Sequence, residues 1–81
     1  MPKITLYGKA GCCLCEDARR ALDDLARTHE FELAEVDIAL DPVLMRRYGE
    51  RIPVVAVDGR DRLELRVAFA DLRDLLDRLA A

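Results

Sequence analysis

The fold is decided by residues 3–16, which read KITLYGKAGCCLCE. Residues 3–7 are rich in β-favouring side chains and predict a buried strand that breaks at Gly8. An amphipathic helix is expected from about Cys12 to Thr28, because its apolar residues recur at spacings of three and four. The sequence therefore predicts a strand, a short loop and a helix, with cysteines where the helix begins.

This position favours redox chemistry of a cysteine pair. Cys12 and Cys15 are three residues apart, so they project from nearly the same side of the first helical turn. Unpaired N–H groups and the helix dipole put partial positive charge there, which favours the thiolate that attacks a disulfide. Cys12 is the candidate nucleophile, and we expect Cys15 to be more buried. Cysteines this close cannot link distant segments, so a structural disulfide framework is excluded.

The middle of the chain predicts a second strand and a short helix. The strand is expected over residues 31–38, where a change in the parity of apolar positions at residues 33–34 suggests a bulge or a late strand start. The helix opens at Asp41-Pro42, a capping residue followed by proline at the first helical position, and ends at Gly49.

The last third predicts a hairpin and a final helix. Residues 54–57 form a β-branched run typical of a central strand, and Asp58-Gly59 predicts a tight turn. The returning strand carries alternating apolar residues at Leu63, Leu65 and Val67, and a helix is expected from about Ala70 to Leu79. The order is βαβαββα. It predicts one α/β domain over residues 1–81, a mixed four-stranded sheet with helices on both faces.

Composition narrows the classes of function. The net charge of −3 is spread over interspersed signs, so we expect no nucleic-acid partner. The sequence has no apolar run of membrane-spanning length, and its first residues lack the features of a signal peptide. We therefore expect no membrane partner and a cytoplasmic, reducing setting. We also expect a monomer.

A Cys-x-x-Cys pair that opens the first helix of such a unit is typical of thioredoxin-like proteins. The chain resembles glutaredoxins, and most of all the divergent, short glutaredoxin-like proteins with a Gly-Cys-x-Leu-Cys-Glu active-site loop. Three segments carry this resemblance: Lys9–Glu16 at the loop, Arg51–Val54 where the fold places a cis-proline, and the hairpin at Val57–Gly59. The stretch Arg66–Asp71 departs from it, because it lacks the glycine turn that helps glutaredoxins hold glutathione.

The resemblance implies a thiol–disulfide oxidoreductase that reduces protein or glutathione mixed disulfides. Cys12 would attack the substrate and Cys15 would resolve the mixed disulfide. The residues implied in binding substrate or glutathione are Lys9, Ile52, Pro53 and Asp71. Glutathione would act as a co-substrate, with a disulfide-containing protein as the other partner and no bound cofactor.

A binding module is the alternative. In that case the cysteines would be idle, or Cys12 would hold a metal or an iron–sulfur cluster shared between two chains. Structural zinc usually takes four ligands from two separated pairs, and His29 lies at the far end of the first helix, so we expect no intramolecular metal site. Cys13 has no assigned step in thiol–disulfide exchange and is interpreted as a passenger.

Overall fold

The computed structural model describes residues 1–80, and its strands form one mixed four-stranded sheet. Ala81, the last residue of the predicted domain, lies outside the described residues. The elements are β1 (Lys3–Gly8), α1 (Cys13–Leu25), β2 (Glu32–Asp37), the 3-10 turn η1 (Ile38–Leu40), α2 (Pro42–Tyr48), β3 (Val54–Val57), β4 (Arg60–Glu64) and α3 (Phe69–Ala80). The strand order is β2-β1-β3-β4, with β1 parallel to β2 and the other two pairs antiparallel. The predicted order βαβαββα is confirmed.

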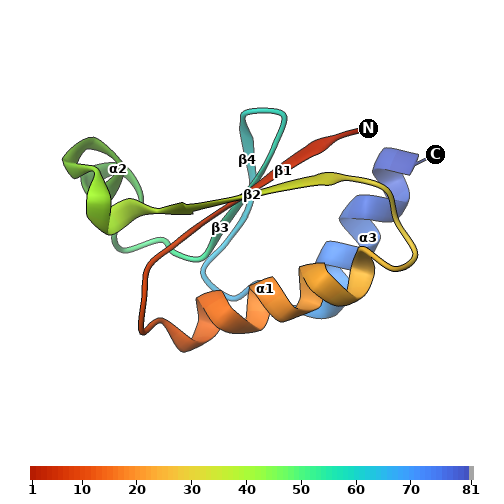
Figure 1. Ribbon diagram of the computed structural model, residues 1–81, viewed down its shortest axis with the longest axis horizontal. Helices are drawn as coiled ribbons and strands as arrows, with labels where there is room; N and C mark the ends of the chain where they lie inside the picture. Colours follow the sequence, from red (N-terminus) through yellow and green to blue (C-terminus); the bar gives the residue numbers. More distant parts are fainter. Residues whose placement is uncertain (81) are drawn as a thin grey trace.

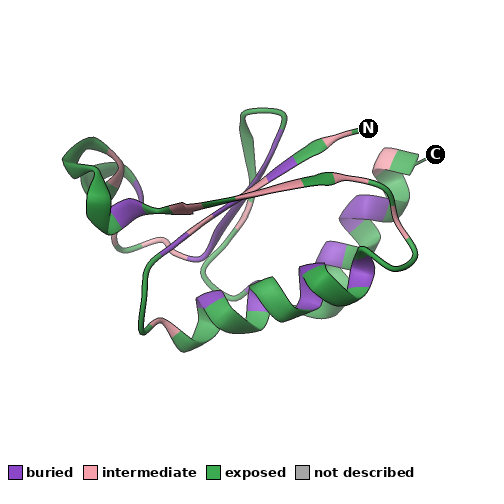
Figure 2. Cartoon of the chain, in the orientation of Figure 1, coloured by how far each residue is buried: buried purple, intermediate pink, exposed green. Residues whose placement is uncertain are grey.

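The main core lies between the sheet and helices α1 and α3. Ile4 and Leu6 of β1 stand beside Val57 and Val55 of β3 in the ladder, so all four side chains point to the same face. Figure 1 shows α1 below the strands and α3 beside the C-terminal end of α1, and Figure 2 shows that α1 turns its buried stripe towards the sheet. The stripe follows from the spacing of three and four residues, and it consists of Ala18, Ala21, Leu22 and Leu25 after Cys15.

Helix α2 covers one end of the opposite face. Its last residue, Tyr48, is buried and stacks on Tyr7 of β1 with ring centroids 4.4 Å apart. Ile38 and Val54 are the other buried residues of this smaller cluster. The helix begins where predicted, because the carboxylate of Asp41 accepts a hydrogen bond from the Val43 N–H at 2.9 Å. The sheet therefore carries helices on both faces.

Strand β2 contains neither a bulge nor a slip over residues 32–37, because each residue pairs in unbroken register with β1. Neither expected cause of the parity change, a bulge or a late strand start, is correct, because β2 begins at Glu32, before the change at residues 33–34. The parity change has another cause: Leu33 lies opposite Ile4 and packs on the main core, whereas Val36 lies opposite Tyr7 on the face that α2 covers. Strand β2 thus places apolar side chains on both faces of the sheet.

Two predicted boundaries were wrong, the end of the first helix and the end of the returning strand. Helix α1 ends at Leu25 rather than Thr28, because the N–H groups of Thr28 and His29 both turn back to the Leu25 carbonyl. Helix α3 spans Phe69–Ala80, within one residue of its predicted bounds at each end. The alternation along the returning strand fails at Leu65, where β4 has ended.

Leu65 departs from the strand because its backbone turns. A register shift interrupts the β3–β4 ladder, Leu65 has a φ of 66°, and its side chain is 50% exposed. Its N–H donates to the carbonyls of both Arg51 and Pro53, at 3.0 and 2.9 Å. The chain leaving β4 is thereby tied to the loop that leads into β3.

Candidate redox site

Cys12 and Cys15 form a disulfide at the start of α1, with Cα atoms 5.2 Å apart. Cys12 is the N-cap residue, with extended backbone, and its Sγ accepts a hydrogen bond from the Cys15 N–H at 3.3 Å. The loop reaches this position through a turn at Gly11, whose φ of 82° is a conformation that glycine adopts at little cost. Cys12 therefore sits where backbone donors and the helix dipole act on its sulfur.

The two cysteines differ in burial, as predicted. Cys15 is only 7% exposed, whereas Cys12 is half-buried and Cys13 carries an exposed free thiol. Gly8 of β1 lies directly against Cys15: a Cβ added there would lie 3.0 Å from the Cys15 Sγ and 3.1 Å from its Cβ. The glycine that ends β1 thus lets the helix approach the sheet at the buried cysteine.

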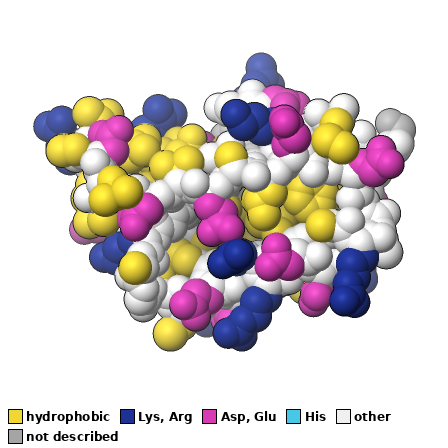
Figure 3. All heavy atoms as spheres, in the orientation of Figure 1, with side chains coloured by type: hydrophobic (Ala, Val, Ile, Leu, Met, Phe, Trp, Pro, Cys, Tyr) yellow, Lys and Arg dark blue, Asp and Glu magenta, His cyan; other side chains and the backbone are white. Residues whose placement is uncertain are grey.

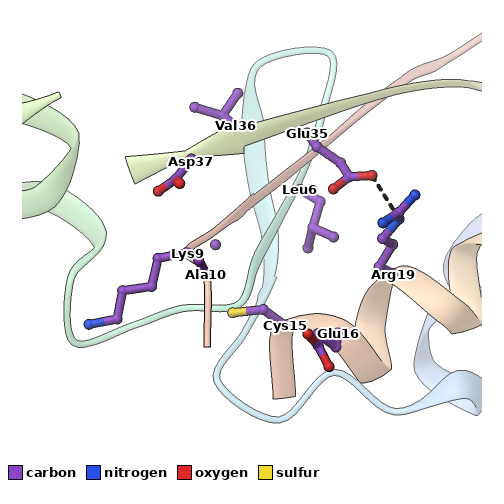
Figure 4. A pocket seen from close by; sticks show the side chains of 10 residues that line it. Leu6, Lys9, Ala10, Cys15, Glu16, Arg19, Glu35, Val36 and Asp37 are labelled. Carbon is purple, nitrogen blue, oxygen red and sulfur yellow. Dashed lines mark ion pairs between the residues drawn. The ribbon is translucent and has the colours of Figure 1, made fainter. Parts of the chain in front are cut away.

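A cavity of about 350 Å³ opens beside Cys15, between the edge of the sheet at β2 and the N-terminal half of α1. Figure 4 shows Glu35 reaching down from β2 towards Arg19 of α1, with which it forms an ion pair at 2.9 Å. Figure 3 shows side chains of both charge signs intermixed on the face above α1. The cavity is lined by Leu6, Gly8, Lys9, Ala10, Cys15, Glu16, Arg19, Glu35, Val36 and Asp37.

The Ile52–Pro53 peptide bond is cis, as the resemblance implied, and Pro53 is buried. Of the residues predicted to bind substrate or glutathione, Lys9 lines the cavity with Cys15, but Ile52 and Pro53 are not among its lining residues. Asp71 lies exposed in the first turn of α3.

A polar network holds the loop that precedes Pro53. The Tyr48 hydroxyl donates to Asp61 at 3.0 Å, and Arg51 forms ion pairs with both Asp61 and Glu64 of β4. Burial, and then the hydrogen bond to Asp61, raise the pKa of Tyr48 above its ordinary value. The network connects the end of α2, the loop before Pro53 and β4.

Sequence reasoning missed Gly8, Arg19, Glu35 and Asp37 as parts of the site. Glu35 and Asp37 face α1 because they lie opposite Leu6 and Gly8 in the parallel register. The sequence did contain a signal for this placement. After Leu33, the residues of β2 that face α1 are the charged Glu35 and Asp37, and this is why the apolar positions change parity within residues 31–38.

The class of the protein follows from a solved structure of the same fold. A mutant thioredoxin from Halobacterium salinarum aligns over 95% of this chain and 73% of its own with a TM-score of 0.72; at 21% identity this shows the fold alone. The protein is thus a thioredoxin-like α/β protein with a Cys-x-x-Cys disulfide at the start of its first helix.

Residues 3–77 match the family described as Glutaredoxin-like domain (DUF836), and the chain belongs to that family. A structural-genomics target from X. campestris, solved by X-ray, is 37% identical with a TM-score of 0.73, covering 93% of this chain and 96% of that one. An uncharacterized protein of Mycobacterium tuberculosis is 31% identical over 74% of this chain and 67% of its own. The predicted family is confirmed.

Two other kinds of feature are absent from the part of the chain that the structure describes. None of the helices within residues 1–80 has the length and apolar character needed to cross a membrane. Over the same residues, His, Cys, Asp and Glu side chains do not come together in a group of three or more suited to a metal ion.

Proposed function

We propose that this protein is a thiol–disulfide oxidoreductase that reduces protein or glutathione mixed disulfides through Cys12 and Cys15. The observation that carries the proposal is the asymmetry of the pair. Cys12 is the half-buried N-cap that receives a backbone N–H bond, and Cys15 lies buried against Gly8. A nucleophile needs access and a stabilised thiolate, and a resolving thiol needs to be protected until a mixed disulfide forms.

The reaction runs in two exchanges. The Cys12 thiolate attacks a substrate disulfide, so that a Cys12–substrate bond forms, the substrate bond breaks, and the first substrate thiolate takes a proton from water. Cys15 then gives up its proton to solvent and attacks the Cys12 sulfur, which releases the second substrate thiolate. The substrate gains two electrons, and the protein is left with the Cys12–Cys15 disulfide.

Substrate contacts are assigned by the family resemblance. Lys9 would pair with a carboxylate of glutathione or support the Cys12 thiolate, Asp71 would contribute the acidic contact, and the backbone at Ile52-Pro53 would pair with an extended substrate. We propose that the partner is a disulfide-containing protein or glutathione, that the protein acts as a monomer, and that it works in the cytoplasm.

The test compares serine variants of neighbouring cysteines. Cys12→Ser should abolish reduction of a protein disulfide, because no other thiol in the loop occupies the N-cap position. Cys13→Ser is the matched control and should retain wild-type turnover. Turnover of Cys12→Ser near the wild-type rate would refute the assignment of the nucleophile.

A second measurement separates enzyme from binding module. The protein is poised across a series of glutathione redox buffers, and each sample is read by intact and peptide mass. Reversible loss of two hydrogens, mapped to Cys12 and Cys15, supports the enzyme. Cysteines that stay reduced at the oxidising end, or a bound metal in place of the disulfide, would favour the module.

A further inference from the structure

Leu65 combines two unfavourable features where β4 ends. Its φ of 66° lies in the left-handed region, which disfavours leucine, and its apolar side chain is 50% exposed to water. Within residues 1–80, the other non-glycine residue with a positive φ is Asp58, which the Asp-Gly turn accounts for. The sequence around Leu65 contains no such turn. A backbone outlier that its local sequence does not explain points to a functional constraint.

The backbone holds Leu65 firmly in this conformation. Its N–H donates to the carbonyls of Arg51 and Pro53, at 3.0 and 2.9 Å. Two residues further along the chain, Val67 is buried in the main core. The chain is therefore fixed on both sides of Leu65 before any substrate binds, and a contact made by its side chain costs little ordering of the backbone.

The register of the sheet places Leu65 close to the disulfide. Continued by one residue, the β1–β3 register puts Pro53 opposite Gly8, and the β3–β4 register puts Leu65 beside Pro53. Gly8 is the residue against which Cys15 lies. Figure 1 shows the chain that leaves β4 descending from the sheet towards α1. Two strand spacings, about 10 Å, separate Leu65 from Gly8, and an extended chain covers that distance in about three residues.

The chemistry of the side chain defines what it can contact. A leucine gains free energy when it is buried against another apolar side chain, and it offers no hydrogen-bond donor or charge. Leu14, which lies between the two cysteines in the sequence, is also 44% exposed. Glutathione has no apolar side chain beside its cysteine, whereas a protein segment can supply one. The exposed leucines thus match a protein disulfide better than a glutathione disulfide.

We propose, resting on the function proposed above, that Leu65 is a specificity-determining residue. It contacts an apolar side chain within about three residues of the cysteine in a protein disulfide, and it thereby favours that class of substrate over glutathione disulfides. The contact forms when the substrate docks and takes no part in the exchange of sulfurs. Its loss should therefore raise the half-saturating substrate concentration and leave the limiting rate of exchange unaltered.

Single-turnover oxidation of the reduced wild-type protein tests the preference directly. The substrates are the symmetric disulfides of two short peptides, with either leucines or serines on both sides of the cysteine, and oxidised glutathione. At low substrate concentration, the leucine peptide should react roughly tenfold faster than the serine peptide. Equal second-order rate constants for the two peptides would overturn the proposal, and this comparison needs no variant that has to fold.

Variants then assign the preference to one side chain. Leu65→Asn keeps a residue that tolerates the left-handed backbone but removes the apolar side chain, so the preference for the leucine peptide should disappear. Leu65→Met retains an apolar side chain and should retain the preference. Leu40→Asn, at a leucine that is 85% exposed on η1, is the matched control and should behave as wild type. A preference that survives in Leu65→Asn would overturn the proposal.

Failure of this inference is distinguishable from failure of the proposed function. Oxidised glutathione and the serine peptide report on sulfur exchange without the apolar contact. If wild-type protein is oxidised by all three disulfides without preference, the exchange chemistry stands and the role of Leu65 is refuted. If none of the three oxidises it, the proposed function itself is refuted, and the role of Leu65 with it.

Discussion

Gly8→Ala tests the contact that seats the buried cysteine. The new Cβ would lie 3.0 Å from the Cys15 Sγ, so the sulfur has to move by a few tenths of an ångström. The φ of Gly8 is not among the positive values of the chain, so the cost is steric rather than conformational. Overpacking of this kind costs about 1–3 kcal/mol.

The cost should depend on the redox state. In the disulfide, Cys15 is tethered to Cys12 and yields little; in the dithiol, its side chain can rotate away from the new methyl group. The oxidised form should therefore lose more stability than the reduced form, and the reduction potential should rise. If the difference is ~1.4 kcal/mol, the potential rises by ~30 mV.

Two assays measure these effects. Urea unfolding of the oxidised and reduced forms gives the two stability losses, and titration in glutathione buffers, read by mass, gives the potential. Equal losses in both forms with an unchanged potential would show that Gly8 does not restrain the Cys15 sulfur, and would refute the steric argument.

Two other substitutions test the core and the polar network. Leu22→Ala removes a side chain that is 0% exposed between α1 and the sheet, and should lower the free energy of unfolding in urea by about 2–5 kcal/mol; a loss below about 1 kcal/mol would contradict the packing. The pKa of Tyr48 is raised on folding, so its contribution to stability is complete below its unfolded pKa of 10.0 and is lost as pH rises through the folded pKa. Urea unfolding from about pH 9 to about pH 12 should show this decline in the wild type and a shallower decline in Tyr48→Phe. The variant should also be about 1 kcal/mol less stable at neutral pH. Parallel pH profiles of the two proteins would refute this role of Tyr48.

The fold could be predicted because its signals are local. Each of these signals depends on a few neighbouring residues. They are the Cys-x-x-Cys loop, the helix start at Asp41-Pro42 and the Asp-Gly turn. The wrong prediction along the returning strand depends on a tertiary contact. In the sequence, Leu65 continues the alternation of the strand. In the structure, its N–H donates to the carbonyls of Arg51 and Pro53 instead of continuing the ladder.

The site was predictable to a similar extent. The pairing of Cys12 with Cys15 follows from their spacing, because residues three apart lie within one helical turn. The cavity beside them needs the parallel register of β1 and β2, which brings Glu35 and Asp37 to the α1 face. Register over that separation is set by packing across the whole sheet, and local sequence patterns do not contain it.

The charged side chains of β4 resemble ordinary surface residues in the sequence. Asp61 and Glu64 nevertheless form ion pairs with Arg51, which directly precedes the Ile52–Pro53 bond. A change of sign at any of the three disturbs a loop on another element. Across relatives of this chain, we expect these positions to covary, so that loss of the arginine is accompanied by loss of its acidic partners. The acidic residues of the β3–β4 hairpin are therefore constrained by the loop that they hold in place, although the hairpin contributes no side chain to the disulfide.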